Sequence, residues 1–87
     1  MKFDWDAHNL AHCRKHGATT AEVEWMLRDA RTRVVGDPFD GEERFRATGG
    51  NKEGRRMFVV FTMRRSKIRP ISARYRHRDD IDEEADS

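Results

Sequence analysis

The chain has 87 residues, with 18 basic and 16 acidic side chains and a formal net charge of +2. A chain of this length forms one small domain with a thin core. No apolar run is long enough to span a membrane, the single cysteine excludes an internal disulfide, and the first residues carry acids where a signal peptide would be apolar. We therefore expect a cytoplasmic protein with no membrane contact.

The charges fall into three blocks. Residues 1–43 carry six bases and nine acids (−3), residues 44–78 carry twelve bases and one acid (+11), and residues 79–87 carry six acids and no base (−6). A strongly cationic segment attracts polyanions, above all nucleic acid. Blocks of like charge are also common on solvated faces, so this pattern alone leaves open a nucleic-acid surface, a merely solvated face and a surface for an acidic protein partner.

Two helices are predicted in the first 30 residues. Lys2–Trp5 alternates polar and apolar residues as a short strand does, and Asp6 can cap a helix over residues 7–16. Thr19 and Glu22 have the spacing of a capping box for a second helix. Its apolar residues recur at helical spacing on one face: Val23, Met26, Leu27 and Ala30. This stripe indicates a helix packed on a sheet.

Four strands are predicted after the helices, over residues 32–35, 43–48, 56–63 and 68–75. The glycine-rich segment 49–54 has the composition of a hairpin loop, and Pro70 implies an edge strand or a bulge. Residues 56–63 are apolar on both faces, which is typical of a strand covered on both sides or at an interface.

This order of elements predicts an α+β fold. An antiparallel sheet would carry the two N-terminal helices on one face, and a short helix over residues 79–85 would close the chain. We expect residues 1–78 to form a single domain and residues 79–87 an acidic C-terminal tail or frayed helix.

The first helix holds three histidines and the cysteine. His8, His12 and His16 recur every four residues, a spacing that can chelate a metal, but the acidic ligands such a site would need are scarce. A polar helix face is the favoured interpretation, and we predict neither a metal nor a cofactor. Its helical spacing places Cys13 on the side of the helix that faces the core, so a buried thiol is favoured over a nucleophile.

The basic strands are the stronger candidate site. Arginine offers paired donors to phosphate and stacks on bases. The cations that neighbouring strands can bring together are Arg44, Arg46, Lys52, Arg55, Arg56, Arg69 and Arg74. RNA cleavage through the 2′-hydroxyl needs a base, a cation at phosphate and an acid. His77 is the only histidine in the basic block, and Tyr75 could stack on a base or donate a proton.

Two motifs resemble the BrnT family of toxins. The first combines Trp5-Asp6, Asn9, His12 and the run from Arg14 to Gly17, and the second is the run Ile68-Arg69-Pro70-Ile71-Ser72-Ala73-Arg74. Between them, Arg44-Phe45, Gly54-Arg55 and the apolar strand Val59-Val60-Phe61 follow in the family's order. After the second motif many relatives continue with a basic helix carrying a glutamate and a tyrosine, where this chain has six acids.

The resemblance implies a RelE-like fold and a ribonuclease toxin of a type II toxin–antitoxin system that shuts down translation. It implies that Arg55 and Arg74 contact RNA or stabilise charge at phosphate, and that Arg69 lines the same surface. Trp5, Asp6, His12 and His16 would hold the first helix against the sheet. A BrnA-like antitoxin would neutralise the toxin, and operator DNA would be contacted only through that antitoxin.

The first hypothesis is therefore a metal-independent endoribonuclease acting on RNA, either free or on the ribosome. Its catalytic residues would be Arg55, Arg74 and His77, with RNA contacts from Arg44, Arg46, Lys52, Arg56, Arg69 and Tyr75. The alternative is a non-catalytic module whose basic sheet binds an antitoxin-like protein or nucleic acid. In a third hypothesis, the acidic tail mimics nucleic acid and folds over the basic sheet.

Overall fold

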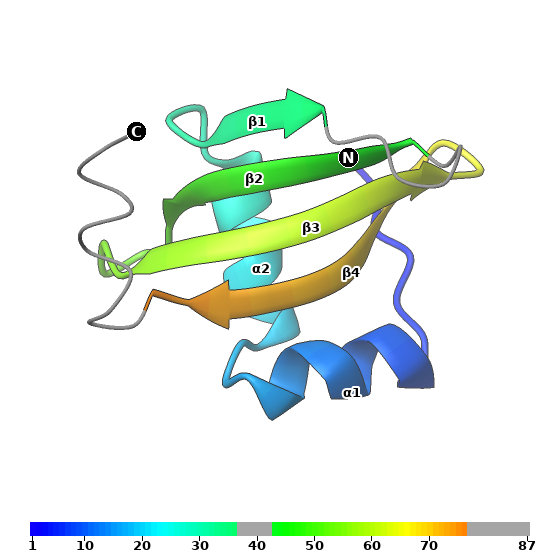
Figure 1. The fold of residues 1–87 in the computed structure, drawn as a ribbon, viewed down its shortest axis with the longest axis horizontal. Coiled ribbons are helices and arrows are strands. Elements are labelled where there is room, and N and C mark those ends of the chain that lie inside the picture. Colours follow the sequence, from blue (N-terminus) through cyan, green and yellow to red (C-terminus); the bar gives the residue numbers. More distant parts are fainter. Residues whose placement is uncertain (37–42, 77–87) are drawn as a thin grey trace.

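The computed structural model describes residues 1–36 and 43–76, which form a helical layer packed on a sheet (Figure 1). Its elements are α1 (Ala7–Lys15), α2 (Thr20–Arg28), β1 (Arg33–Gly36), β2 (Arg44–Gly50), β3 (Arg56–Arg64) and β4 (Lys67–Tyr75). The strands form one antiparallel sheet in the order β1-β2-β3-β4. Helix α2 lies behind the sheet and α1 runs along β4 (Figure 1). The predicted α+β class is confirmed, while the helix expected over residues 79–85 lies outside the described residues.

Both predicted N-caps are confirmed. The Asp6 carboxylate accepts from the backbone N–H groups of His8 at 2.9 Å and Asn9 at 3.1 Å, and the Asn9 side chain accepts from the Asp6 N–H at 2.7 Å. Thr19 and Glu22 make the same reciprocal pair at the start of α2. Each box satisfies backbone donors that a helix start leaves without intrahelical partners. Neither of these two helices has the length and apolarity needed to cross a membrane.

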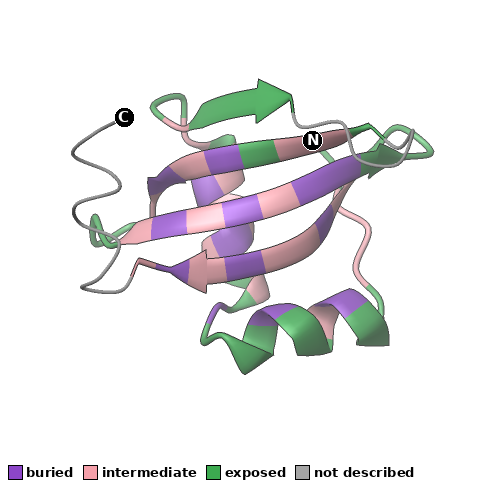
Figure 2. Ribbon diagram, in the orientation of Figure 1, coloured by how far each residue is buried: buried purple, intermediate pink, exposed green. Residues whose placement is uncertain are grey.

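The core lies between α2 and one face of the sheet (Figure 2). Helix α2 buries Val23 and Met26, while Ala30 is exposed because the helix ends at Arg28, before the predicted stripe does. Alternate residues of three strands complete this core: Ala47, Met57, Val59, Phe61, Ala73 and Tyr75. Side chains alternate along a strand, so the strand residues between these core positions lie on the opposite face of the sheet.

The strand predicted over Lys2–Trp5 is wrong. Only one bridge forms there, pairing Phe3 in parallel with Ile68 at the β4 edge. Two backbone hydrogen bonds hold it, from the Asp4 N–H to the Ile68 carbonyl at 2.8 Å and from the Ile68 N–H to the Lys2 carbonyl at 2.9 Å. The next carbonyl, that of Asp4, instead accepts from the side chain of Asn9 at 2.9 Å, so the pairing stops where the chain turns into α1.

Strand β4 is an edge of the described sheet and also contains a bulge, as Pro70 indicated. Val60 pairs with Ser72 but its neighbour Phe61 pairs with Pro70, which leaves Ile71 as the extra residue. Proline has no N–H to donate and is tolerated at such irregular edge positions. The register shift brings Pro70, Ala73 and Tyr75 onto the core face.

The two-sided cover predicted for the central strand is not found in the described part of the chain. Met57, Val59 and Phe61 are buried against the helices, whereas Phe58 and Val60 on the other face are only half-buried. No described helix or strand lies over them. The apolar side chains of that face are therefore part of a surface that also carries arginines.

Close packing at Gly49 gives the first testable prediction. A Cβ atom at this position would lie 2.4 Å from Thr32 Oγ1 and 3.2 Å from Thr32 Cβ. Thr32 cannot yield easily because its hydroxyl donates to the Met26 carbonyl at 2.6 Å. We expect Gly49→Ala to lower the free energy of unfolding by about 1–3 kcal/mol, measured by urea denaturation.

The matched control for this prediction is Gly36→Ala, because a Cβ there meets no atom within 4 Å. This control should unfold at the wild-type urea concentration. Equal stability of the two variants would show that the Gly49 contact does not constrain packing.

Candidate nucleic-acid interface

The surface of the sheet opposite α2 is called the open face. Ala47 and Val59 face the helices. Because side chains alternate along a strand, the residues next to each of them in sequence, and the cross-strand partners of those residues, belong to the open face. Its members on β2, β3 and β4 include Arg44, Arg46, Thr48, Gly50, Arg56, Phe58, Val60, Thr62, Arg69, Ser72 and Arg74. Strands β1–β4 contain no acidic residue, so the charge that they contribute to the open face is entirely positive.

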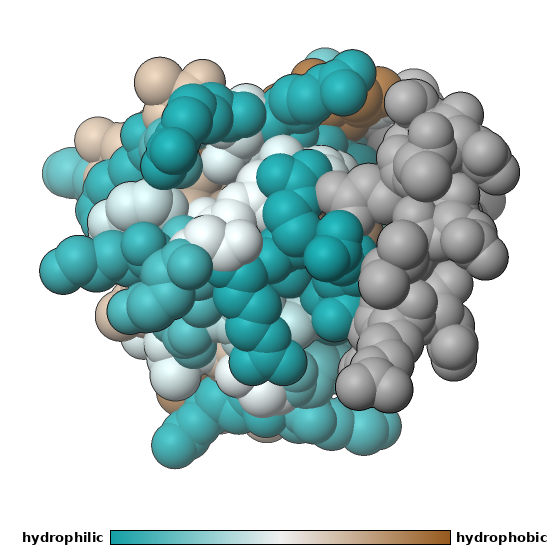
Figure 3. Space-filling view, turned by 90° about the vertical axis from the view of Figure 1, so that its left-hand side faces the viewer, coloured by the Kyte–Doolittle hydropathy of each residue, from teal (hydrophilic) through white to brown (hydrophobic). Residues whose placement is uncertain are grey.

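Four of the predicted site residues gather at the end of the sheet where the β2–β3 hairpin lies. They are Lys52, Arg55, Arg56 and Arg74. Arg56 pairs with Gly50, and Arg74 pairs with Phe58 two residues further along β3, so the two arginines are diagonal neighbours on the open face. Side chains at this end of the molecule are predominantly hydrophilic (Figure 3). This arrangement fits a surface for phosphate groups.

Arg74 lies over an aromatic ring. Its guanidinium carbon is 4.7 Å from the centroid of the Phe58 ring, within the range of a cation–π contact. The planar guanidinium is thereby held over the hairpin end of the open face. The ring restrains the side chain that ends the second sequence motif.

Tyr75 was predicted to contact RNA, but its ring is buried on the core face, with 4% of its surface exposed. Its hydroxyl donates to the Glu22 carboxylate on α2, and Asn51 donates to the same hydroxyl at 3.2 Å. The Arg55 guanidinium covers the ring, with its carbon 4.0 Å from the centroid. This burial argues against the predicted stacking on a base and gives Tyr75 a structural role.

The pKa values of Glu22 and Tyr75 in this cluster are shifted in opposite directions. Burial acts to raise the pKa of Glu22, but hydrogen bonds from Tyr75 and Thr19 outweigh it and leave that pKa below its usual value. Burial, and then the hydrogen bond with Glu22, raise the pKa of Tyr75. A charged carboxylate therefore accepts from a neutral phenol, which is a strong pairing.

Asn51 connects this cluster to the hairpin. Its side-chain oxygen accepts from the N–H groups of Glu53 at 3.0 Å and Arg55 at 2.9 Å, while its amide nitrogen donates toward Tyr75 and Glu22. Asparagine is favoured in turns because it makes such backbone contacts. The loop therefore begins at Asn51 rather than at the preceding glycines, which belong to β2. The backbone position of Arg55 is fixed by the same side chain.

Arg44 and Arg69 lie at the opposite end of the sheet. They pair across Thr62, which is four residues along β3 from Phe58, or roughly 13 Å at the rise of a strand. The Arg69 guanidinium is 2.8 Å from the Asp6 carboxylate and 3.6 Å from that of Asp4. Arg69 therefore binds the N-terminal segment to β4. The predicted residues form two groups rather than one site, with Arg46 exposed between them on β2.

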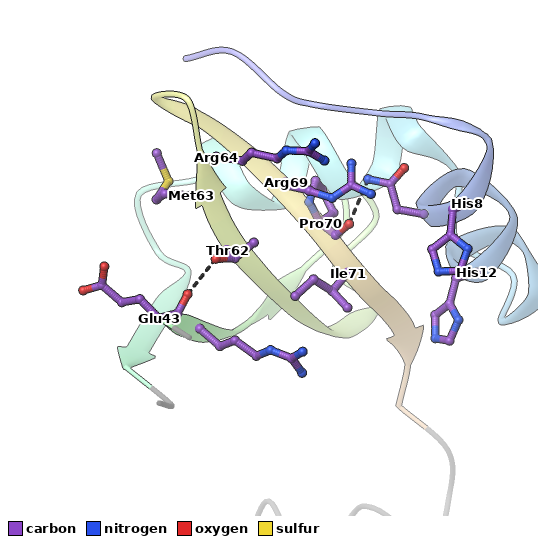
Figure 4. Close-up of a pocket in the computed structure, with 11 residues that line it drawn as sticks. His8, His12, Glu43, Thr62, Met63, Arg64, Arg69, Pro70 and Ile71 are labelled. Carbon is purple, nitrogen blue, oxygen red and sulfur yellow. Dashed lines mark hydrogen bonds between the residues drawn. The ribbon is translucent and has the colours of Figure 1, made fainter. Parts of the chain in front are cut away.

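A cavity of about 570 Å³ lies between α1 and this second end of the sheet (Figure 4). Its lining includes His8, His12, Arg44, Arg64 and Arg69. The acids paired with two of these arginines reduce its positive character. Within residues 1–36 and 43–76, no group of three or more histidine, cysteine or acidic side chains is placed to hold a metal.

The residues expected to hold the first helix play different parts. The Trp5 indole donates to Glu24 at 2.9 Å and Asp6 caps α1, so both tie the start of the chain to the fold. His12 and His16 are exposed, with their ring centroids 5.7 Å apart, and do not hold α1 to the sheet. Cys13 is buried as predicted, and burial raises the pKa of its thiol, which disfavours a nucleophilic role.

Sequence reasoning missed two residues of this region. Phe58 could have been found from the alternation of β3, since burial of its sequence neighbours Met57 and Val59 places Phe58 on the other face of the strand. For Asn51, the only signal in the sequence was the general preference of asparagine for turns. His77, predicted as a proton carrier, lies beyond the last residue that the structure describes.

Comparison with known proteins places the two motifs in one family. The family described as ribonuclease toxin, BrnT, of type II toxin–antitoxin systems matches residues 5–80. That range includes both sequence motifs, the whole described sheet and the hairpin cluster. A comparison with curated proteins finds no match.

Proposed function

The chain belongs to the BrnT family of ribonuclease toxins of type II toxin–antitoxin systems, and from this premise we propose that it is a metal-independent endoribonuclease that inhibits translation by cleaving messenger RNA. The observation that carries the proposal is the group of cations at the hairpin end of the open face. Arg56 on β3 and Arg74 on β4 lie there, and Arg55 lies at the same end of the sheet but over the Tyr75 ring on the core side. A RelE-like fold is part of the proposal, supported by two helices on a four-stranded antiparallel sheet.

The proposed chemistry is attack of a 2′-oxygen on the neighbouring phosphorus. The P–O bond to the 5′-oxygen breaks as the new bond forms, the 2′-hydroxyl loses its proton, and the 5′-oxygen gains one. In this scheme Arg74 stabilises the extra negative charge on phosphate through guanidinium hydrogen bonds, and Arg55 joins it when its guanidinium leaves the Tyr75 ring. His77 is the proposed proton carrier. Arg44, Arg46, Lys52 and Arg56 hold neighbouring phosphates.

The proposed partner is a BrnA-like antitoxin, with operator DNA contacted only through it. A type II system implies an antitoxin protein, and charge complementarity makes the open face a suitable surface for an acidic segment. The cytoplasm, where messenger RNA and ribosomes are found, is the proposed location.

The test is RNA cleavage by the purified chain on naked RNA in EDTA, with a parallel assay in Mg²⁺ buffer on message supplied with ribosomes, which need Mg²⁺ to stay assembled. Cleavage should continue at an unchanged rate in the chelator, because the proposed charge stabilisation comes from arginines rather than from a metal. Loss of cleavage in EDTA, with recovery on adding Mg²⁺, would contradict metal independence. RNA that stays intact in both settings would favour the non-catalytic module.

A further inference from the structure

Phe58 is the one aromatic residue that β3 presents on the open face. It is half-buried and lies within the hairpin-end group of cations, directly across from Arg74. Its neighbours along β3 are Arg56 and Val60, and its partners across the sheet are Thr48 and Arg74. A phenyl ring on a cationic sheet has an apolar surface to offer to a ligand that carries phosphates.

Several described neighbours of this ring on β2 and β4 have small side chains. On the β2 side the open face has Thr48 and then Gly50, and on the β4 side it has Ser72. These are small side chains, so they do not rise as high as the ring. The Arg74 guanidinium lies over the ring at 4.7 Å, and guanidinium groups stack on planar π systems as readily as rings do. Phe58 and Arg74 therefore form a pair of planar groups in contact on the open face.

We infer that Phe58 and Arg74 form a stacking platform for an unpaired nucleobase, and that the ligand of the open face is single-stranded RNA. A base stacks on an aromatic ring or a guanidinium plane whatever its sequence, whereas the bases of a duplex are already stacked on one another. Phosphates on either side of the stacked base would meet Arg56 on one flank and Arg46 on the other. The inference rests on the proposed function, which supplies RNA as the ligand class.

The test measures binding to a 2′-O-methyl oligouridylate of about ten nucleotides, a length suited to single-strand sites. Its blocked 2′-oxygens prevent cleavage during the measurement. Phe58→Leu keeps the apolar bulk but removes the π face, and should weaken binding about 10-fold to 100-fold. Phe58→Tyr and Phe58→Trp should retain wild-type affinity. The same strand paired with its complement should bind more weakly to wild type and respond little to Phe58→Leu.

The salt dependence separates stacking from charge. For Arg46→Ala, the slope of log affinity against log salt should fall by about 0.7, the value of one phosphate contact on a single strand. Phe58→Leu should leave that slope unchanged. If Phe58→Leu lowers the slope, the ring acts only by holding Arg74 on phosphate, and the platform for a base is wrong.

Other results also decide the matter. Equal binding of single and double strands, with no effect of Phe58→Leu, would overturn the platform while leaving the ribonuclease proposal intact. No binding to either strand, together with intact RNA in the cleavage assay, would instead count against the ribonuclease proposal itself. If Phe58→Leu weakens only the complex with the antitoxin, the ring belongs to a protein interface and the inference fails. Thermal melting of each variant confirms that it is folded.

Discussion

Arg74→Ala is expected to lower the rate of RNA cleavage by about 100-fold to 1,000-fold, the usual cost of removing a donor that stabilises charge in the transition state. Arg74 is the natural choice because its guanidinium is held over the Phe58 ring on the open face rather than on the core side. The measurement is the single-turnover cleavage rate at saturating enzyme, which isolates the chemical step from binding. Expression of the variant should no longer arrest growth.

Arg74→Lys sharpens this prediction. Lysine keeps the positive charge but loses the planar fork that binds phosphate through two donors and stacks on the ring. Its rate should therefore fall between those of wild type and Arg74→Ala. If the lysine variant matched wild type, charge alone would be sufficient at this position.

Arg14→Ala is the matched control, because it removes the same charge from an exposed position on α1. It should cleave RNA at the wild-type rate. Arg74→Ala with wild-type activity would remove Arg74 from the mechanism. Equal losses in both variants would instead show that only the overall charge of the protein matters.

The elements with strong local signals were predicted well from the sequence. The N-cap at Asp6, the capping box at Thr19 and the stripe of α2 depend on residues at most four positions apart, so they are visible in the chain itself. Pro70 likewise indicated an edge strand and a bulge because proline lacks an N–H. Such features depend on local chemistry that any sequence displays.

The wrong predictions depend on long-range contacts. Tyr75 was placed on the RNA surface, but the bulge in β4 and the Glu22 carboxylate, 53 residues away, fix it on the core side. Lys2–Trp5 alternates as a strand does, yet the Asn9 amide takes the Asp4 carbonyl that strand pairing would need. The ion pairs of Arg69 with the N-terminal segment also depend on such contacts, and its predicted place on the RNA surface stays a prediction. Sequence alone shows the available donors and acceptors but not their partners.

Asn9 is expected to be the largest single contributor to stability among the polar side chains of α1. It is 2% exposed, and its amide nitrogen donates to the carbonyls of Asp4 and Pro70, both at 2.9 Å. Its oxygen accepts from the Asp6 N–H at 2.7 Å. One side chain therefore joins the N-terminal segment, the start of α1 and the bulge of β4.

Asn9→Ala should lower the free energy of unfolding by about 2–4 kcal/mol, because it leaves buried carbonyls without donors. For a domain of this size, that corresponds to a fall in Tm of roughly 10–25 °C. The measurement is thermal unfolding followed by circular dichroism. Asn9→Asp should be no better, since a carboxylate can replace the acceptor but cannot donate to either carbonyl.

His8→Ala is the control, because His8 is the exposed neighbour of Asn9 in the same helical turn. Its melting temperature should stay within a few degrees of wild type, since surface substitutions usually change stability by less than about 0.5 kcal/mol. Melting of Asn9→Ala close to wild type would show that water satisfies the two carbonyls. The cleavage rate of folded Asn9→Ala at low temperature should remain near wild type, because Asn9 lies at the α1 side of β4 and the proposed catalytic arginines lie at the hairpin end. A stability defect without a rate defect would separate Asn9, which holds the fold, from Arg74, which is proposed to act on RNA.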